Sequence, residues 1–133
     1  MYEKIRETAK FLRDIGIEKP DIGIVLGTGL GGVVNMIDIV KRIAYHDIPN
    51  FPVSTVKGHS GTLIYGQLAG KSVLAMQGRF HFYEGWAMDE VTFPIRVMKL
   101  LGVDKLMVSN ACGGVNPDFE VGDVMIITDH INM

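Results

Sequence analysis

Cysteine is nearly absent from this sequence, which has one, Cys112, among 133 residues. A single cysteine cannot form an intrachain disulfide, and it cannot build a cysteine-based zinc framework. Among small residues we expect Cys112 to be a small buried apolar side chain rather than a nucleophile, because no spacing fixes a base beside it. The low cysteine content fits a reducing compartment, and we expect a cytoplasmic protein.

Long hydrophobic runs are also missing. No stretch approaches the roughly 20 apolar residues that a membrane helix needs. The start of the chain is charged and is followed by no long apolar run, which does not match a secretory signal. We therefore expect no membrane partner.

Neither sign of charge dominates, because 13 Lys and Arg stand against 15 Asp and Glu, with a pI near 6.0. No bulk cationic field attracts nucleic acid or anionic lipid, so any phosphate must be held by a local site. Apolar residues make up 47% and charged residues 21%, as in soluble globular proteins. The length alone suits one ordinary domain.

Glycine is the residue in excess, with 16 of 133 positions, or about 12% against an average near 7%. The apolar spacing around these glycines predicts amphipathic helices, buried-type strands and one hairpin. We expect helices at 3–15 and 89–101, a weak helix at 33–38, and strands at 22–26, 39–45, 62–68, 72–77, 105–109 and 123–128. Pro94 suggests a kink or a late start in the second helix. The alternation predicts an α/β fold with a mixed central β-sheet flanked by helices.

The glycine-rich segment 27–32 directly follows the first predicted strand and allows three interpretations. It matches a dinucleotide fingerprint, although that site needs a helix directly after the loop and an acidic residue ending the next strand. It could also be a tight turn without a ligand. The third interpretation fits the composition best: glycines let backbone amides approach an anion, and the Thr28 hydroxyl adds a donor.

Segment 77–85 is the most informative, because it places Arg, His, Tyr and Glu between glycines just after a strand. Arg79 offers a planar fork suited to phosphate, His81 can add a donor, and Tyr83 can present a flat face to a sugar. Glu84 could orient the side chain of either Arg79 or His81. The alternative is an exposed, salt-bridged loop with aromatic anchors.

Two weaker segments resemble these in composition. Residues 58–61 form a small-residue corner carrying His59, and residues 110–114 follow an apolar strand and can turn backbone amides toward a ligand. The four histidines show no metal-site spacing, so we expect no metal.

Together, segments 24–31, 56–61, 77–85, 110–116 and 121–132 resemble, in order, the trimeric purine nucleoside phosphorylases that act on inosine and guanosine. The resemblance implies reversible phosphorolysis of a purine nucleoside to free base and ribose 1-phosphate, without a metal or organic cofactor. It also implies a homo-oligomer, specifically a trimer.

The resemblance also assigns residues. It implies a phosphate site made by Thr28, His59, Arg79, Phe80, His81 and the amide of Ala111. It implies nucleoside contacts from Tyr83 and Asn110, and a catalytic pair of His81 and Glu84.

Two departures from the family pattern keep alternatives open. Thr28 stands where inosine- and guanosine-cleaving members usually carry Ser. A Thr at this position resembles the related methylthioadenosine phosphorylases. The family chain is about twice as long, so residues 1–133 are expected to be the N-terminal portion of a single phosphorylase-like domain that is incomplete. Three origins would fit this length: a fragment, a separately encoded subunit completed by a C-terminal half, or a truncated reading frame. So would a non-catalytic anion-binding protein.

Overall fold

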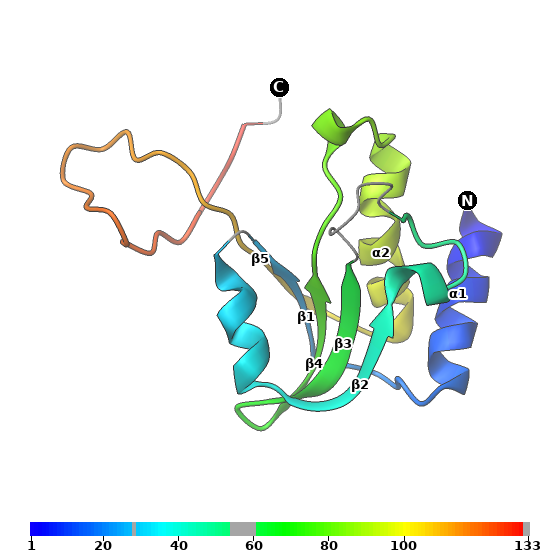
Figure 1. The fold of residues 1–133 in the computed structure, drawn as a ribbon. Helices are drawn as coiled ribbons and strands as arrows, with labels where there is room; N and C mark the ends of the chain where they lie inside the picture. The colour runs from blue at the N-terminus through cyan, green and yellow to red at the C-terminus, as the bar shows by residue number, and fades with distance from the viewer. Residues whose placement is uncertain (28, 54–60, 132–133) are drawn as a thin grey trace.

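The computed structural model describes residues 1–27, 29–53 and 61–131 (Figure 1). Thr28 and His59, both predicted to bind phosphate, lie outside the described residues. The helices are α1 (Tyr2–Asp14) and α2 (Met88–Leu101), with the short 3-10 helices η1 (Leu30–Met36), η2 (Tyr45–Asp47) and η3 (Phe82–Glu84). The strands are β1 (Ile22–Leu26), β2 (Asp38–Ala44), β3 (Thr62–Leu68), β4 (Lys71–Gln77) and β5 (Lys105–Val108).

The five strands form one mixed sheet in the order β2-β3-β4-β1-β5. The hairpin predicted between the strands at 62–68 and 72–77 is present: its turn at Ala69 and Gly70 joins β3 to β4, which pair antiparallel. β1 lies parallel to β4 on one side and to β5 on the other, with Ile22 opposite both Val73 and Lys105. The predicted mixed α/β fold is therefore confirmed.

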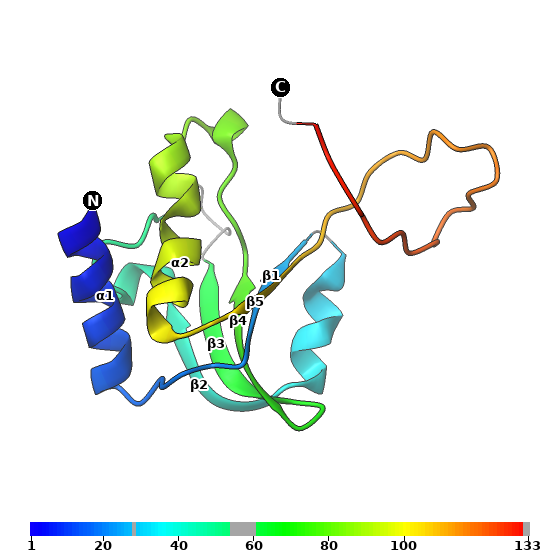
Figure 2. The ribbon, with the colours of Figure 1, turned by 180° about the vertical axis from the view of Figure 1, so that it is seen from behind.

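Helices cover the two faces of the sheet unequally. Both α1 and α2 pack on one face, whereas η1, the cyan helix in Figures 1 and 2, is the one described helix on the other face. Strand side chains alternate between the two cores: Leu74 and Met76 of β4 join the α1 and α2 side, while Val73 and Ala75 join the side of η1. The central strands are apolar on both faces because both faces are covered.

The predicted helices form, with small differences at their ends. α1 buries Ile5, Ala9 and Leu12 along one stripe, as its spacing indicates. α2 begins six residues before Pro94, so the predicted late start is wrong. The weak helix predicted at 33–38 is instead the 3-10 helix η1, which begins earlier in the chain.

The prediction of a strand at 123–128 is wrong. The segment after β5 leaves the sheet, as the orange and red trace in Figure 1 shows, and it pairs with no described strand. Val124, Ile126 and Ile127 are 94%, 86% and 56% exposed. An apolar segment becomes a strand only where a neighbouring strand satisfies its backbone, and none lies beside this one. β5 does form, but Met107 is 60% exposed, so the expectation that this strand is buried is also wrong.

Candidate active site at the parallel strand ends

The sheet brings three of the glycine-containing segments to one edge. β4, β1 and β5 are neighbours and run parallel, so their carboxyl ends meet. They lead into residues 78–85, 27–32 and 109–116 respectively. Ligands of α/β sheets bind in the crevice outside the carboxyl ends of such strands. The fold thus explains why segments about 50 and 80 residues apart in sequence can serve one site.

Arg79 lies just beyond the end of β4 and is held from two sides. Its Nη1 donates to the carbonyl oxygen of Ser109 at 2.6 Å, and its Nε donates to Nε2 of His81 at 2.9 Å. The side chain is half-buried, which limits its freedom before any ligand arrives. A guanidinium held in this way retains further N–H groups for an anion.

His81 and Glu84, the predicted catalytic pair, are in contact. His81 Nδ1 lies 3.0 Å from Glu84 Oε1, and the backbone N–H of His81 donates to Glu84 Oε2 at 3.1 Å. Arginine can only donate, so the Nε2 that faces Arg79 must be the acceptor nitrogen of the ring. The proton of the neutral ring is therefore on Nδ1, which donates it to Glu84. Arg79, His81 and Glu84 form one ordered chain of hydrogen bonds.

The loop that carries this chain is anchored by aromatic side chains. Phe80 is buried between Tyr45 and Trp86, with ring centroids 5.5 and 5.4 Å away. The buried hydroxyl of Tyr45 donates to the carbonyl oxygen of Gly78 at 2.6 Å. Burial raises the pKa of Tyr45, so the hydroxyl stays protonated and keeps its donor role. The buried side chain of Phe80 leaves its backbone as the part that could contact a phosphate.

Tyr83 packs on this loop without being covered by it. Its ring stacks on His81 with a centroid distance of 4.7 Å and an interplanar angle of 18°. The side chain is nevertheless 81% exposed. The other flat face is thus available to a ligand, and the predicted sugar contact remains a prediction.

Sequence reasoning missed Ser109, which connects all three strand ends. Its hydroxyl accepts the N–H of Gly27 at 2.9 Å, and its carbonyl receives Arg79. The sequence predicts it only as the last residue of the buried-type strand at 105–109. The signal that could have identified Ser109 is its position at the end of a predicted strand and directly before segment 110–114. A hydroxyl at that point can bridge to the neighbouring strand end.

Asn110 and Ala111 are both exposed on the segment that leaves the sheet. They follow Ser109 directly, so their backbone starts at the strand-end cluster, but their predicted ligand contacts stay predictions. Cys112 is exposed, so its expected burial is wrong. The reason is that the segment around it packs against no described element.

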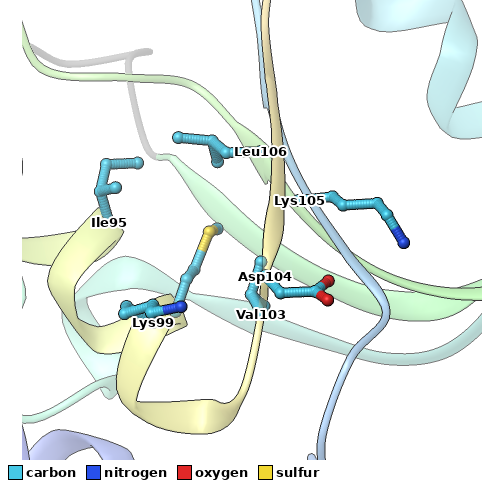
Figure 3. Close-up of a pocket in the computed structure, with 7 residues that line it drawn as sticks. Ile95, Lys99, Val103, Asp104, Lys105 and Leu106 are labelled. Carbon is cyan, nitrogen blue, oxygen red and sulfur yellow. The ribbon is translucent and has the colours of Figure 1, made fainter.

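A shallow hollow lies elsewhere, between α2 and β5 (Figure 3). Its lining includes the apolar side chains of Met98, Val103 and Leu106 and the charged side chains of Lys99 and Asp104. It contains none of the predicted site residues. Over residues 1–27, 29–53 and 61–131 there is no cluster of metal-ligating side chains and no helix suited to spanning a bilayer.

Neighbouring parallel strands that lead into segments with arginine, histidine and glycine are typical of α/β proteins with a ligand crevice at that edge of the sheet. Residues 21–133 match the family model described as the phosphorylase superfamily, and the chain belongs to that superfamily.

Curated relatives share high identity with this chain. Purine nucleoside phosphorylase 1 of Geobacillus stearothermophilus is 59% identical over 96% of this chain and 47% of its own length. The Bos taurus purine nucleoside phosphorylase is 52% identical over 99% of this chain and 46% of its own. The chain thus spans about half the length of these relatives.

Solved structures agree with this assignment. A purine nucleoside phosphorylase in complex with ribose-1-phosphate superposes with a TM-score of 0.85 and 50% identity, covering 91% of this chain and 44% of that one. The Schistosoma mansoni enzyme in complex with inosine gives a TM-score of 0.80 and 47% identity, covering 91% and 42%.

Proposed function

We propose that this chain supplies the phosphate and ribose side of a purine nucleoside phosphorylase site. The observation that carries the proposal is the ordered chain of Arg79, His81 and Glu84 at the carboxyl ends of the parallel strands. Membership of the superfamily and relatives that carry this name support it. The solved neighbours hold ribose-1-phosphate or inosine, which are the product and substrate classes of the proposed reaction.

The proposed reaction is phosphorolysis of inosine- or guanosine-type nucleosides. A phosphate oxygen attacks C1′, the bond from C1′ to the purine nitrogen breaks, and the base leaves with the electron pair. Positive charge develops on the sugar as that bond breaks, so a phosphate dianion held beneath C1′ both stabilises the charge and completes the product. No metal or organic cofactor is needed.

Each predicted residue has a role in this scheme. Arg79 holds the phosphate, and His81, oriented by Glu84, contributes a polar group beside it. Tyr83 contacts the ribose, with Asn110 on the nucleoside side. The Thr28 hydroxyl, His59 and the backbone of Phe80 and Ala111 complete the phosphate shell.

The chain spans about half of its relatives, so the proposal includes a complementary C-terminal half that completes the nucleoside site. The working unit is proposed to be a cytoplasmic homotrimer, as the family resemblance implies. Exposed apolar residues after β5 support the need for a further partner, because monomeric proteins rarely expose such runs.

Phosphate binding is the direct test of the site. Titration of inorganic phosphate, followed by amide and guanidinium NMR signals, should show saturable binding to the wild-type chain. Arg79→Ala should weaken it by about tenfold or more, because charge-assisted hydrogen bonds are lost. Arg96→Ala is the matched control, since it removes an equal charge from an exposed position on α2. Equal weakening by both variants would contradict a specific role for Arg79.

Catalysis is tested by inosine phosphorolysis with the chain alone and with the second half of the Geobacillus stearothermophilus relative. Activity only in the mixture supports the proposed division of the site. Phosphate binding without activity in either case would favour a non-catalytic anion-binding protein. Preference for methylthioadenosine over inosine would favour the alternative that Thr28 suggests.

A further inference from the structure

Ser109 is the first residue after β5 and lies half-buried beside the end of β1. Its backbone N–H donates to Val25 O at 3.3 Å, and its hydroxyl donates to the same oxygen at 3.2 Å. The hydroxyl also accepts the N–H of Gly27 at 2.9 Å. One side chain therefore donates to β1 and accepts from the residue that opens the glycine-rich loop.

This double role needs a hydroxyl group, which donates one hydrogen bond and accepts others. Alanine would leave the N–H of buried Gly27 without this partner, and a buried unsatisfied donor is costly. Threonine keeps the group. The position is thus chemically specific within the sheet.

The approach of Gly27 to Ser109 is also tight. A Cβ at Gly27 would lie 2.5 Å from the carbonyl oxygen of Ser109, so only glycine fits there without displacement. The same carbonyl oxygen receives Arg79 Nη1 at 2.6 Å. The position of that peptide therefore sets both the start of the glycine-rich loop and the direction of the guanidinium.

We propose that Ser109 is a positioning residue for the anion site. It acts through its hydroxyl, which fixes Gly27 and the 109–110 peptide and so directs Arg79 toward the ligand. This inference rests on the proposed function, because the ligand is taken to be phosphate. Ser109 itself is not assigned a contact with the ligand.

Three variants separate positioning from general stability. Ser109→Ala removes the hydroxyl, and Ser109→Thr keeps it. Ser72→Ala is the matched control, because Ser72 also uses its hydroxyl as donor and acceptor, with Asp21, but at the start of β4 and the opposite end of the sheet. Ser109→Cys, which keeps the shape with a weakly bonding thiol, replaces the alanine variant if that variant does not fold.

The first measurement is the dissociation constant for inorganic phosphate. We expect Ser109→Ala to raise it about tenfold, and Ser109→Thr and Ser72→Ala to stay within about twofold of wild type. Unchanged binding by Ser109→Ala would overturn the proposal. So would equal weakening by Ser72→Ala, because stability alone would then account for the loss.

The second measurement does not depend on phosphate. The NMR signal of Arg79 Nε–H, which donates to His81, should shift or broaden in Ser109→Ala but not in Ser109→Thr or Ser72→Ala. If the wild-type chain binds no phosphate, the proposed function fails, and this signal still decides the role of Ser109. An unchanged Arg79 signal in Ser109→Ala would refute positioning.

Discussion

Two short apolar runs of the same kind end in opposite surroundings. Val73–Met76 in β4 is at most 2% exposed, whereas Val124 and Ile126, from the run 124–127, are 94% and 86% exposed. β4 lies between β3 and β1 and has helices over both faces, while 124–127 pairs with no described strand. Burial of an apolar run is thus decided by its neighbours rather than by its own composition.

The same contrast divides the candidate site. Arg79, His81 and Glu84 belong to a loop fixed by aromatic packing and by Ser109. Asn110 and Ala111 open the segment that packs on nothing described. The part of the candidate site on residues 79–84 therefore has a built scaffold, whereas the part at residues 110 and 111 depends on what joins this segment.

The largest effect should come from the buried run. Leu74→Ala removes a side chain with 0% exposure, and we expect a loss of about 2–5 kcal/mol in the free energy of unfolding. Leu106→Ala in β5 is the matched control, because that leucine is 42% exposed and should cost clearly less. Urea unfolding curves measure both. Equal losses would show that the exposed edge is as well packed as the centre of the sheet.

An intermediate effect should come from the anchor beneath the site loop. Tyr45→Phe removes the hydrogen bond to Gly78 O and should cost about 1 kcal/mol. Tyr65→Phe, whose hydroxyl makes a long, exposed contact with Glu18 O at 3.4 Å, should cost much less. The measurement is again the free energy of unfolding, and a larger loss for Tyr65→Phe would contradict the anchoring role.

Tyr45 also predicts a pH dependence. Burial raises the pKa of its hydroxyl above the ordinary value near 10, so the unfolded chain releases this proton first. The contribution of this buried, neutral hydroxyl to the free energy of unfolding is present below pH 10. It is lost as the pH rises above 10, by up to about 1.4 kcal/mol per pH unit. Unfolding measured from pH 8 to 11 should show wild type losing stability faster than Tyr45→Phe. Parallel curves would argue against a buried, neutral hydroxyl.

The sequence predicted those parts of the molecule whose structure depends on residues close to one another along the chain. The helical stripe of α1 and the hairpin at Ala69 and Gly70 follow from spacing and turn residues, and the sequence pointed to Arg79 and His81 by their chemistry. Ser109 was not predicted, because its role depends on β1, β4 and β5 lying side by side. The prediction of a strand at 123–128 is wrong for the same reason, because apolar spacing cannot show whether a partner strand is present.

The smallest effect should come from the exposed run, and it tests the comparison from the other side. Ile126→Ser should change the free energy of unfolding by less than about 0.5 kcal/mol, because the side chain is 86% exposed. Ile64→Ser is the matched control: that isoleucine is 0% exposed in β3, and the change should cost at least about 2 kcal/mol. Amide hydrogen exchange gives a second measure, with fast exchange expected at 124–127 and slow exchange at 73–76. Protection at 124–127, or a large loss for Ile126→Ser, would mean that this run packs in solution, and the contrast between the two sides of the site would then disappear.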